Sequence, residues 1–170
     1  MYRSRAIAFL LVAASAAYAV STRAGETPPL APNGIELPKN YKNWRVLGVS
    51  HREDNTSLRA ILGNYAAMQA AQKGQTDPWP DGAIFAKVVW NDSKHPFWDT
   101  ATVPGEFSHV EFMIKDATKY GSTGGWGFAR WKGEGLTPYG ADASFAQECF
   151  NCHGAAKSTD HVFTRPVKMP

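Results

Sequence analysis

Two cysteines and a histidine stand together near the end of this 170-residue chain, in the run Cys149-Phe150-Asn151-Cys152-His153. Residues i and i+3 share one face of a helix, about 5–6 Å apart, so both thiols could reach the vinyl groups of one porphyrin. C-x-x-C-H is the attachment pattern of c-type haem. We therefore expect Cys149 and Cys152 to form two thioethers and His153 to bind the haem iron as its axial ligand.

Two other uses of a cysteine pair fit this sequence less well. A structural zinc site needs four ligands, usually from a second Cys or His pair, and the chain contains only two cysteines. A thioredoxin-type redox pair belongs near a βαβ pattern, early in its domain, whereas this pair lies close to the last residue. The favoured interpretation is one covalently attached haem c per chain.

The first residues have the composition of a secretory signal peptide. Two early arginines precede an apolar stretch over residues 6–16, and residues 17–19 (Ala-Tyr-Ala) fit the small-x-small cleavage pattern. We expect residues 1–24 to be a signal peptide that is cut after Ala19 or Ala24. A retained anchor is the alternative, but the stretch is too short to span a bilayer, and no cysteine follows it directly to carry a lipid. The sequence thus predicts a periplasmic protein without a membrane anchor.

The remainder is predicted to be a single domain with a flexible leader. Residues 25–40 are rich in Pro, Gly and Asn and lack hydrophobic periodicity, so residues 41–170 are expected to form the haem domain. The formal net charge is only +3, and it falls further without the signal peptide, so nucleic-acid binding has no electrostatic support. Nine Phe, six Tyr and six Trp suit a core around a large flat cofactor.

Hydrophobic patterning predicts an α+β fold, a predominantly antiparallel sheet with a few flanking helices. Strands are predicted at residues 44–49, 83–90, 106–115 and 125–131. After an N-cap at Asn55 or Thr56, apolar residues at helical spacing predict an amphipathic helix that ends near Lys73; they are Leu58, Ile61, Leu62, Tyr65 and Met68. A last short helix, beginning near Asp142, is expected to carry the haem motif.

The place of the motif separates this chain from the common small cytochromes c, which are all-helical with C-x-x-C-H near the start. Here the motif closes the domain, after a predicted sheet. This arrangement resembles the cytochrome P460 (P-460) family and its sister group, cytochrome c'-beta, over about Tyr41 to Arg165. The matching stretches are YKNWRVLGVSHREDNTSLRAILGN, WPDGAIFAKVVW, VPGEFSHVEFMIKDATKY, GGWGFARW and ECFNCHGAAKSTDHVFTRP.

The resemblance implies a homodimer of mainly β subunits, each with one haem whose iron has His153 as its only protein ligand. In the enzymatic members a strand lysine is bonded to a porphyrin meso carbon, and these proteins oxidise hydroxylamine. The lysine that matches by position in AIFAKVVW is Lys87. The resemblance thus implies a haem oxidoreductase that acts on hydroxylamine or a related small nitrogen compound. A soluble cytochrome c is a reasonable electron acceptor for it.

The residue types around Lys87 allow two interpretations. By strand alternation it shares a face with Phe85 and Val89, and desolvation beside an apolar cofactor favours the unprotonated, nucleophilic amine. Alternatively, Lys87 is an edge-strand lysine that reaches water and limits aggregation.

The groups on the open side of the haem would decide between three functions. Hydroxylamine oxidation needs a proton acceptor, and candidate polar residues are Glu106, Glu111, Asp142 and, for hydrogen bonding, Arg130. Capping phenylalanines are typical of the cytochrome c'-beta group, which binds nitric oxide or carbon monoxide; the candidates are Phe85, Phe112 and Phe145. A sixth methionine ligand would instead make a simple electron-transfer cytochrome c; the candidates are Met68, Met113 and Met169.

Four further histidines are expected to be structural or surface residues: His51, His95, His109 and His161. Of these, His109 could share a strand face with Glu111 and form a proton relay.

Overall fold

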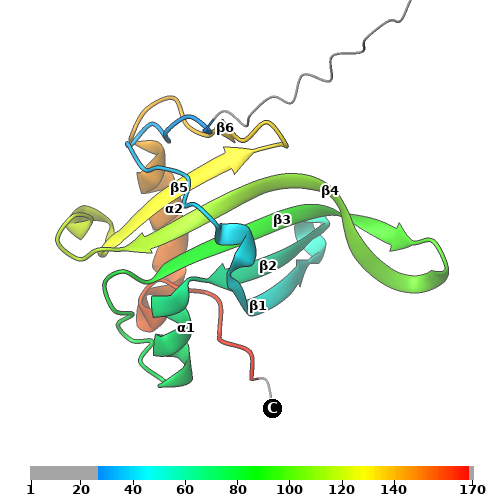
Figure 1. Ribbon diagram of the computed structural model, residues 1–170, viewed down its shortest axis with the longest axis horizontal. Coiled ribbons are helices and arrows are strands. Elements are labelled where there is room, and N and C mark those ends of the chain that lie inside the picture. The colour runs from blue at the N-terminus through cyan, green and yellow to red at the C-terminus, as the bar shows by residue number, and fades with distance from the viewer. Residues whose placement is uncertain (1–26, 169–170) are drawn as a thin grey trace, which may run out of the picture.

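Each strand of the sheet pairs with the next strand of the chain. The computed structural model describes residues 27–168 and contains one six-stranded antiparallel sheet in the order β1 to β6 (Figure 1). This confirms the predicted α+β class. The predicted signal peptide and Met169 lie outside the described residues. The strands are β1 (Arg45–Arg52), β2 (Ser57–Gly63), β3 (Ile84–His95), β4 (Trp98–Lys115), β5 (Trp126–Lys132) and β6 (Thr137–Pro138).

Two α-helices and four short 3₁₀ turns complete the described part of the chain. The α-helices are α1 (Tyr65–Gln72) and α2 (Phe145–His153). The 3₁₀ turns are η1 (Tyr41–Asn43), η2 (Glu53–Asn55), η3 (Gly121–Thr123) and η4 (Gly154–Thr159). None of the helices in residues 27–168 is long and apolar enough to cross a membrane.

The helix predicted after Thr56 is wrong in its first half. Ser57–Gly63 form β2, which lies between β1 and β3. This strand has apolar residues on both faces, Leu58 and Leu62 on one and Ile61 on the other, and their spacing imitated a helical stripe. The helix begins only at Tyr65, where the Asn64 side chain accepts a hydrogen bond of 2.9 Å from the backbone N–H of Ala67 and so caps it. Its end beside Lys73 agrees with the prediction.

The other predicted strands are present, but β3 and β4 are longer than their apolar patterns. They continue into a hairpin that projects beyond the rest of the sheet (Figure 1). The added residues 91–95 and 98–105 are mostly polar, and Phe97 in the turn is 92% exposed. Because this part of the hairpin covers no core, it leaves no hydrophobic pattern to predict it from.

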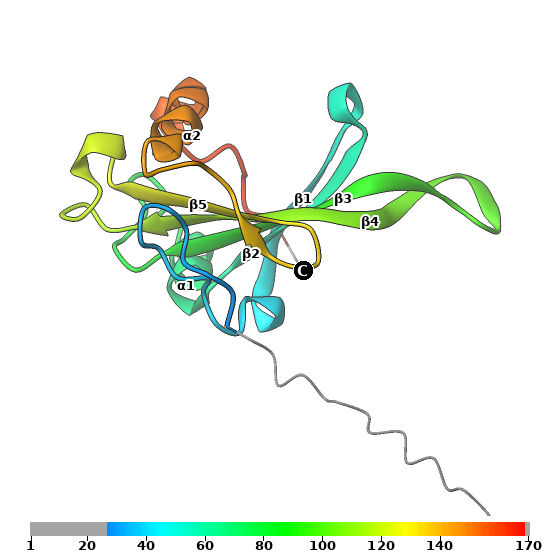
Figure 2. The ribbon, with the colours of Figure 1, turned by 90° about the horizontal axis from the view of Figure 1, so that it is seen from above.

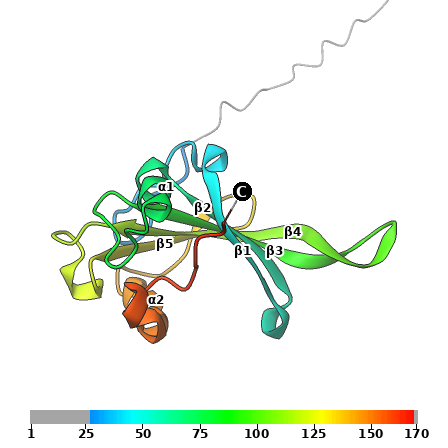
Figure 3. The same ribbon diagram turned by 90° about the horizontal axis from the view of Figure 1, so that it is seen from below.

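The two faces of the sheet bury different partners. In Figures 2 and 3, α2 lies on one side of the sheet, and the η2 turn between β1 and β2 bends toward that same side. The face under α2 contributes Phe85, Phe128 and the half-buried Met113 to a cluster with Cys149 and Phe150 of the helix. We call this side the α2 face. It is where the haem motif meets the sheet.

The opposite face is covered by the segment expected to be a flexible leader. Ala31 and Ile35 are 2% and 4% exposed and join Phe112 and Trp131 in a second cluster. The indole N–H of Trp131 donates to the carbonyl of Pro29 at 2.9 Å. The segment therefore packs as part of the core, because its few apolar residues are spaced to meet the sheet.

Candidate haem-binding site

Helix α2 carries the C-x-x-C-H run, as the sequence predicted. The Asp142 side chain accepts from the backbone N–H of Ser144 at 2.8 Å just before the helix, and the 3% exposed Phe145 anchors its first turn. Cys149 is half-buried and Cys152 is exposed. The two thiols lie one helical turn apart and are unbridged. Burial raises the pKa of the Cys149 thiol.

His153, the last residue of α2, has one ring nitrogen engaged by the protein. Its Nδ1 lies 2.7 Å from the backbone carbonyl oxygen of His161. A carbonyl can only accept, so Nδ1 donates and Nε2 carries the lone pair that a metal requires. The ring packs between Phe128 and Phe163, at 5.3 and 5.1 Å between centroids. Burial lowers the pKa of His153 and favours the neutral imidazole. Two free thiols and this donor fit a c-type haem.

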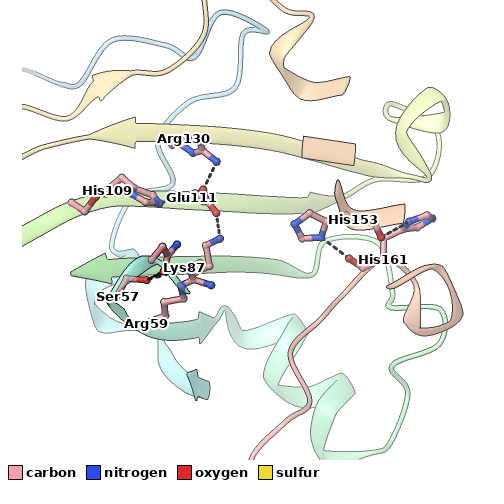
Figure 4. A network of polar contacts seen from close by, with 10 residues as sticks. Ser57, Arg59, Lys87, His109, Glu111, Arg130, His153 and His161 are labelled. Carbon is pink, nitrogen blue, oxygen red and sulfur yellow. Dashed lines mark hydrogen bonds and ion pairs between the residues drawn. The ribbon is translucent and has the colours of Figure 1, made fainter. Parts of the chain in front are cut away.

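Lys87 lies in the interior of the sheet, directly opposite a carboxylate. The strand register pairs Lys87 on β3 with Glu111 on β4, and Glu111 with Arg130 on β5. Lys87 forms an ion pair with Glu111 Oε2, and Arg130 lies 2.5 Å from Glu111 Oε1 (Figure 4). His109 Nε2 is 3.3 Å from the same Oε1. The edge-strand interpretation of Lys87 is therefore wrong.

The charge of Glu111 is held by its three partners. Its side chain is only 18% exposed, and burial alone would raise its pKa. The hydrogen bond from His109 and the positive charges of Lys87 and Arg130 outweigh that effect and hold the pKa of Glu111 well below its usual range. Glu111 is thus an ionised carboxylate in a cationic surrounding.

This arrangement makes the stability of the protein depend on acid pH. A depressed pKa in the folded state means that the stabilisation from Glu111 is complete above its ordinary pKa of 4.5 and is lost as pH falls toward the folded value. We expect the free energy of unfolding in urea to fall by on the order of 2–3 kcal/mol through this group between about pH 6 and pH 2. Glu111→Gln should flatten that part of the curve, whereas Glu106→Gln, exposed on the same strand, should keep it. Parallel curves for wild type and Glu111→Gln would contradict the assignment.

The network lies on the α2 face with the haem motif. Glu111 and Met113 lie on the same face of β4, and Lys87 and Phe85 lie on the same face of β3. Phe85 and Met113 belong to the cluster that also includes Cys149. Figure 4 shows Lys87, Glu111 and Arg130 on neighbouring strands, and His153 of α2 to one side of them. The charges of Lys87 and Glu111 also act on the pKa of His153. The fold thus places Lys87, Glu111 and His153, the predicted axial ligand, around one region.

Arg59 is a member of this region that sequence reasoning missed. It lies on β2 opposite Val89, whose side chain shares the face of Lys87. Burial lowers the pKa of Arg59, while Glu111 acts in the opposite direction. Its buried Nε has no hydrogen-bond partner among the described residues, and neither has Arg130 Nε. Strand alternation around Ile61 would have located Arg59, but the mistaken helix concealed it.

The other two predicted carboxylates, and two of the three phenylalanines, lie away from Lys87. Glu106 and Asp142 are exposed. Phe112 packs on Tyr41 at the opposite face, and Phe145 packs on Tyr139. Phe85 is on the α2 face, but it is 3% exposed and enclosed by two tryptophans, Trp79 and Trp126.

The remaining candidates have ordinary structural partners. Met68 is buried in the cluster of α1, and Met113 packs at its margin. His51 pairs with Asp92 at 2.6 Å, and His95 Nδ1 accepts from the N–H of Phe97 in the hairpin turn. His109 and Glu111 do share a face, as predicted. His161 contacts His153 through its backbone carbonyl.

Comparison with known proteins agrees with this geometry. The family model described as Cytochrome P460 matches residues 38–164, which include all six strands, Lys87, Glu111 and the haem motif. Comparison with curated proteins finds no match. A family match over most of the chain, with a free imidazole beside two thiols, implies a haem cofactor. This chain belongs to the cytochrome P460 family of haem proteins.

Proposed function

We propose that this protein is a periplasmic, mono-haem c-type cytochrome that oxidises hydroxylamine or a related small nitrogen compound. The observation that carries the proposal is the pairing of Lys87 with the buried carboxylate of Glu111, on the face where α2 presents His153. A haem bound through Cys149, Cys152 and His153 would supply the electron acceptor. The signal peptide, a homodimeric assembly and a soluble cytochrome c as electron acceptor belong to the same proposal.

Glu111 supplies the proton acceptor that oxidation of an amine nitrogen needs. Its Oε1 is 3.3 Å from His109 Nε2, and the His109 side chain is 23% exposed. In the tautomer with its proton on Nδ1, donated to the Ser108 hydroxyl, His109 has a free Nε2 that takes the proton from Glu111, and the ring then releases a proton to solvent. The hydroxyl of Ser108 lies 2.9 Å from His109 Nδ1 and orients the ring for this transfer.

A bond between Lys87 and the porphyrin would change the basicity of Glu111. While Lys87 is an ammonium group, its charge lowers the pKa of Glu111, and a carboxylate of very low pKa is a weak base. An amine bonded to an aromatic macrocycle is uncharged at neutral pH. The cross-link would thus remove one of the three groups that depress the pKa of Glu111 and make it a better proton acceptor.

The α2 face favours this function over binding of an uncharged gas. The groups beside Lys87 are charged, namely Glu111, Arg130 and Arg59. Among the three phenylalanines considered, Phe112 and Phe145 pack elsewhere and Phe85 is enclosed by tryptophans. A polar, proton-accepting surface suits a nitrogen substrate that must lose protons.

Peptide mapping of the holoprotein tests the proposal. After proteolysis, mass spectrometry should find the Lys87 peptide covalently joined to the haem peptide. In Lys87→Arg the corresponding peptide should be free, and hydroxylamine should no longer reduce added cytochrome c. Lys94→Arg, an exposed change on the same strand, should behave as wild type. A free Lys87 peptide in wild type would sink the oxidation hypothesis. In that case, nitric oxide binding to the ferrous haem would favour the gas-binding alternative, and resistance to it would favour simple electron transfer.

A further inference from the structure

The turn after α2 has an unusual backbone. Asp160 and His161 both have left-handed conformations, with φ of 51° and 65°. Residues other than glycine seldom adopt such angles, and two in succession are held only where the surrounding structure requires them. The turn therefore has to be held by contacts outside itself.

A buried ion pair provides the main contact. Lys115 Nζ, at the end of β4, is 2.8 Å from both carboxylate oxygens of Asp160, and the two side chains are 7% and 10% exposed. The same carboxylate accepts from the backbone N–H of Trp79 at 2.8 Å. The Asp160 carbonyl accepts from the indole N–H of Trp126, also at 2.8 Å. We call these four residues the Asp160 clamp.

The clamp determines where the next carbonyl points. The oxygen of His161 accepts from His153 Nδ1 at 2.7 Å, and His161 Nδ1 lies 3.3 Å from the carbonyl oxygen of His153 in return. The His161 ring packs on Phe150 at 5.0 Å between centroids. It also abuts Gly124, where an added Cβ would lie 2.8 Å from His161 Nε2. His161 is thus located by its ring on one side and by Asp160 on the other.

We propose that the Lys115–Asp160 pair positions the axial ligand, by holding the His161 carbonyl as acceptor for His153 Nδ1. This inference depends on the proposed ligation of haem iron by His153, but not on any reaction. A firm hydrogen bond at Nδ1 fixes the tautomer of an imidazole ligand and raises its basicity. A more basic ligand stabilises the oxidised metal. The clamp therefore strengthens the bond between His153 and iron and lowers the reduction potential of the haem.

The test compares variants that loosen the clamp without leaving an unpaired buried charge. Lys115→Met/Asp160→Asn removes both charges together, and asparagine tolerates the left-handed conformation of residue 160. Trp126→Phe removes the hydrogen bond to the Asp160 carbonyl and keeps an aromatic ring in the core. Asp116→Asn is the matched control, since Asp116 neighbours Lys115 but its side chain accepts from the local N–H of Lys119 and contacts no member of the clamp.

The readouts are the iron–histidine stretch of the ferrous protein in resonance Raman spectra and the reduction potential. The double variant should shift the stretch to lower wavenumber and raise the potential. Trp126→Phe should do the same to a smaller extent, and Asp116→Asn should match wild type. Unshifted values in either clamp variant that binds haem would overturn the inference.

A measurement on the wild-type protein covers the case in which neither clamp variant matures. The His153 Nδ1 proton should exchange with deuterium far more slowly than an exposed imidazole proton, and immediate exchange would overturn the inference. Absence of an iron–histidine stretch in wild type would instead refute the ligation by His153, which separates the two failures.

Discussion

Replacing Cys149 and Cys152 together by alanine is expected to yield a protein from which acidified organic solvent extracts all of the haem. Wild-type haem should remain with the polypeptide through the same extraction. The two thiols lie one turn apart on α2, half-buried and exposed respectively, so both are available to form thioethers. No other cysteine exists in the chain to replace them. The measurement is haem staining of a denaturing gel beside the spectrum of the extract.

Two further variants make this result specific to the thiols. Asn151→Ala lies between the cysteines and changes only a polar contact with Gln147, so its haem should stay on the polypeptide. His153→Ala keeps both thiols and should remove the iron–histidine stretch from whatever haem is attached. Haem that leaves the wild-type chain on extraction would refute covalent attachment.

Helix α2, which carries the C-x-x-C-H run, was predictable because its signal is local. One short stretch contains the polar residues that begin the helix, Asp142 and Ser144, the apolar Phe145 and the C-x-x-C-H run. The strand character of Lys87 was equally local, since β-branched and aromatic residues surround it. The prediction for β2 failed because its environment is not local. It is paired with a strand on either side, and those partners are absent from its own sequence.

The partners of Lys87 could not be derived from the sequence, because they depend on register. Glu111 was one of three carboxylate candidates, and only the pairing of β3 with β4 brings it opposite Lys87. That pairing contains irregularities near Trp90 and Lys94. Each bulge shifts the register by a residue and exchanges the faces of the strand. A count along the sequence therefore cannot tell which carboxylate meets the lysine.

The partners in the Asp160 clamp could not be derived from the sequence either. Lys115 and Asp160 are far apart in the chain. The left-handed turn formed by Asp160 and His161 contains no glycine from which it could be predicted. His161 was expected to be a structural or surface residue. Its backbone carbonyl proves to be the partner of His153 Nδ1, and a role of the backbone leaves no mark on residue type.

Glu111→Gln is expected to lower the rate of hydroxylamine oxidation by about 10²–10⁴-fold, the usual contribution of a positioned proton acceptor. Glutamine keeps the shape and can still accept hydrogen bonds from His109 and Arg130, but it cannot take up a proton at neutral pH. Glu111→Asp retains the carboxylate and should keep part of the rate. The measurement is hydroxylamine-dependent reduction of added cytochrome c, at equal haem content.

Loss of structure must be separated from loss of the proton acceptor, because Glu111 also balances the charges of Lys87 and Arg130. Haem content and the Lys87 cross-link are therefore measured in the same preparation, and Glu106→Gln controls for an amide on β4. If Glu111→Gln retains the cross-link and oxidises hydroxylamine at the wild-type rate, another base must act. That outcome would also refute the proton path through His109. If instead only the uncross-linked fraction is inactive, Glu111 serves to direct Lys87 toward the haem. The charge pairing seen across β3 and β4 then acts in maturation of the protein and not in turnover.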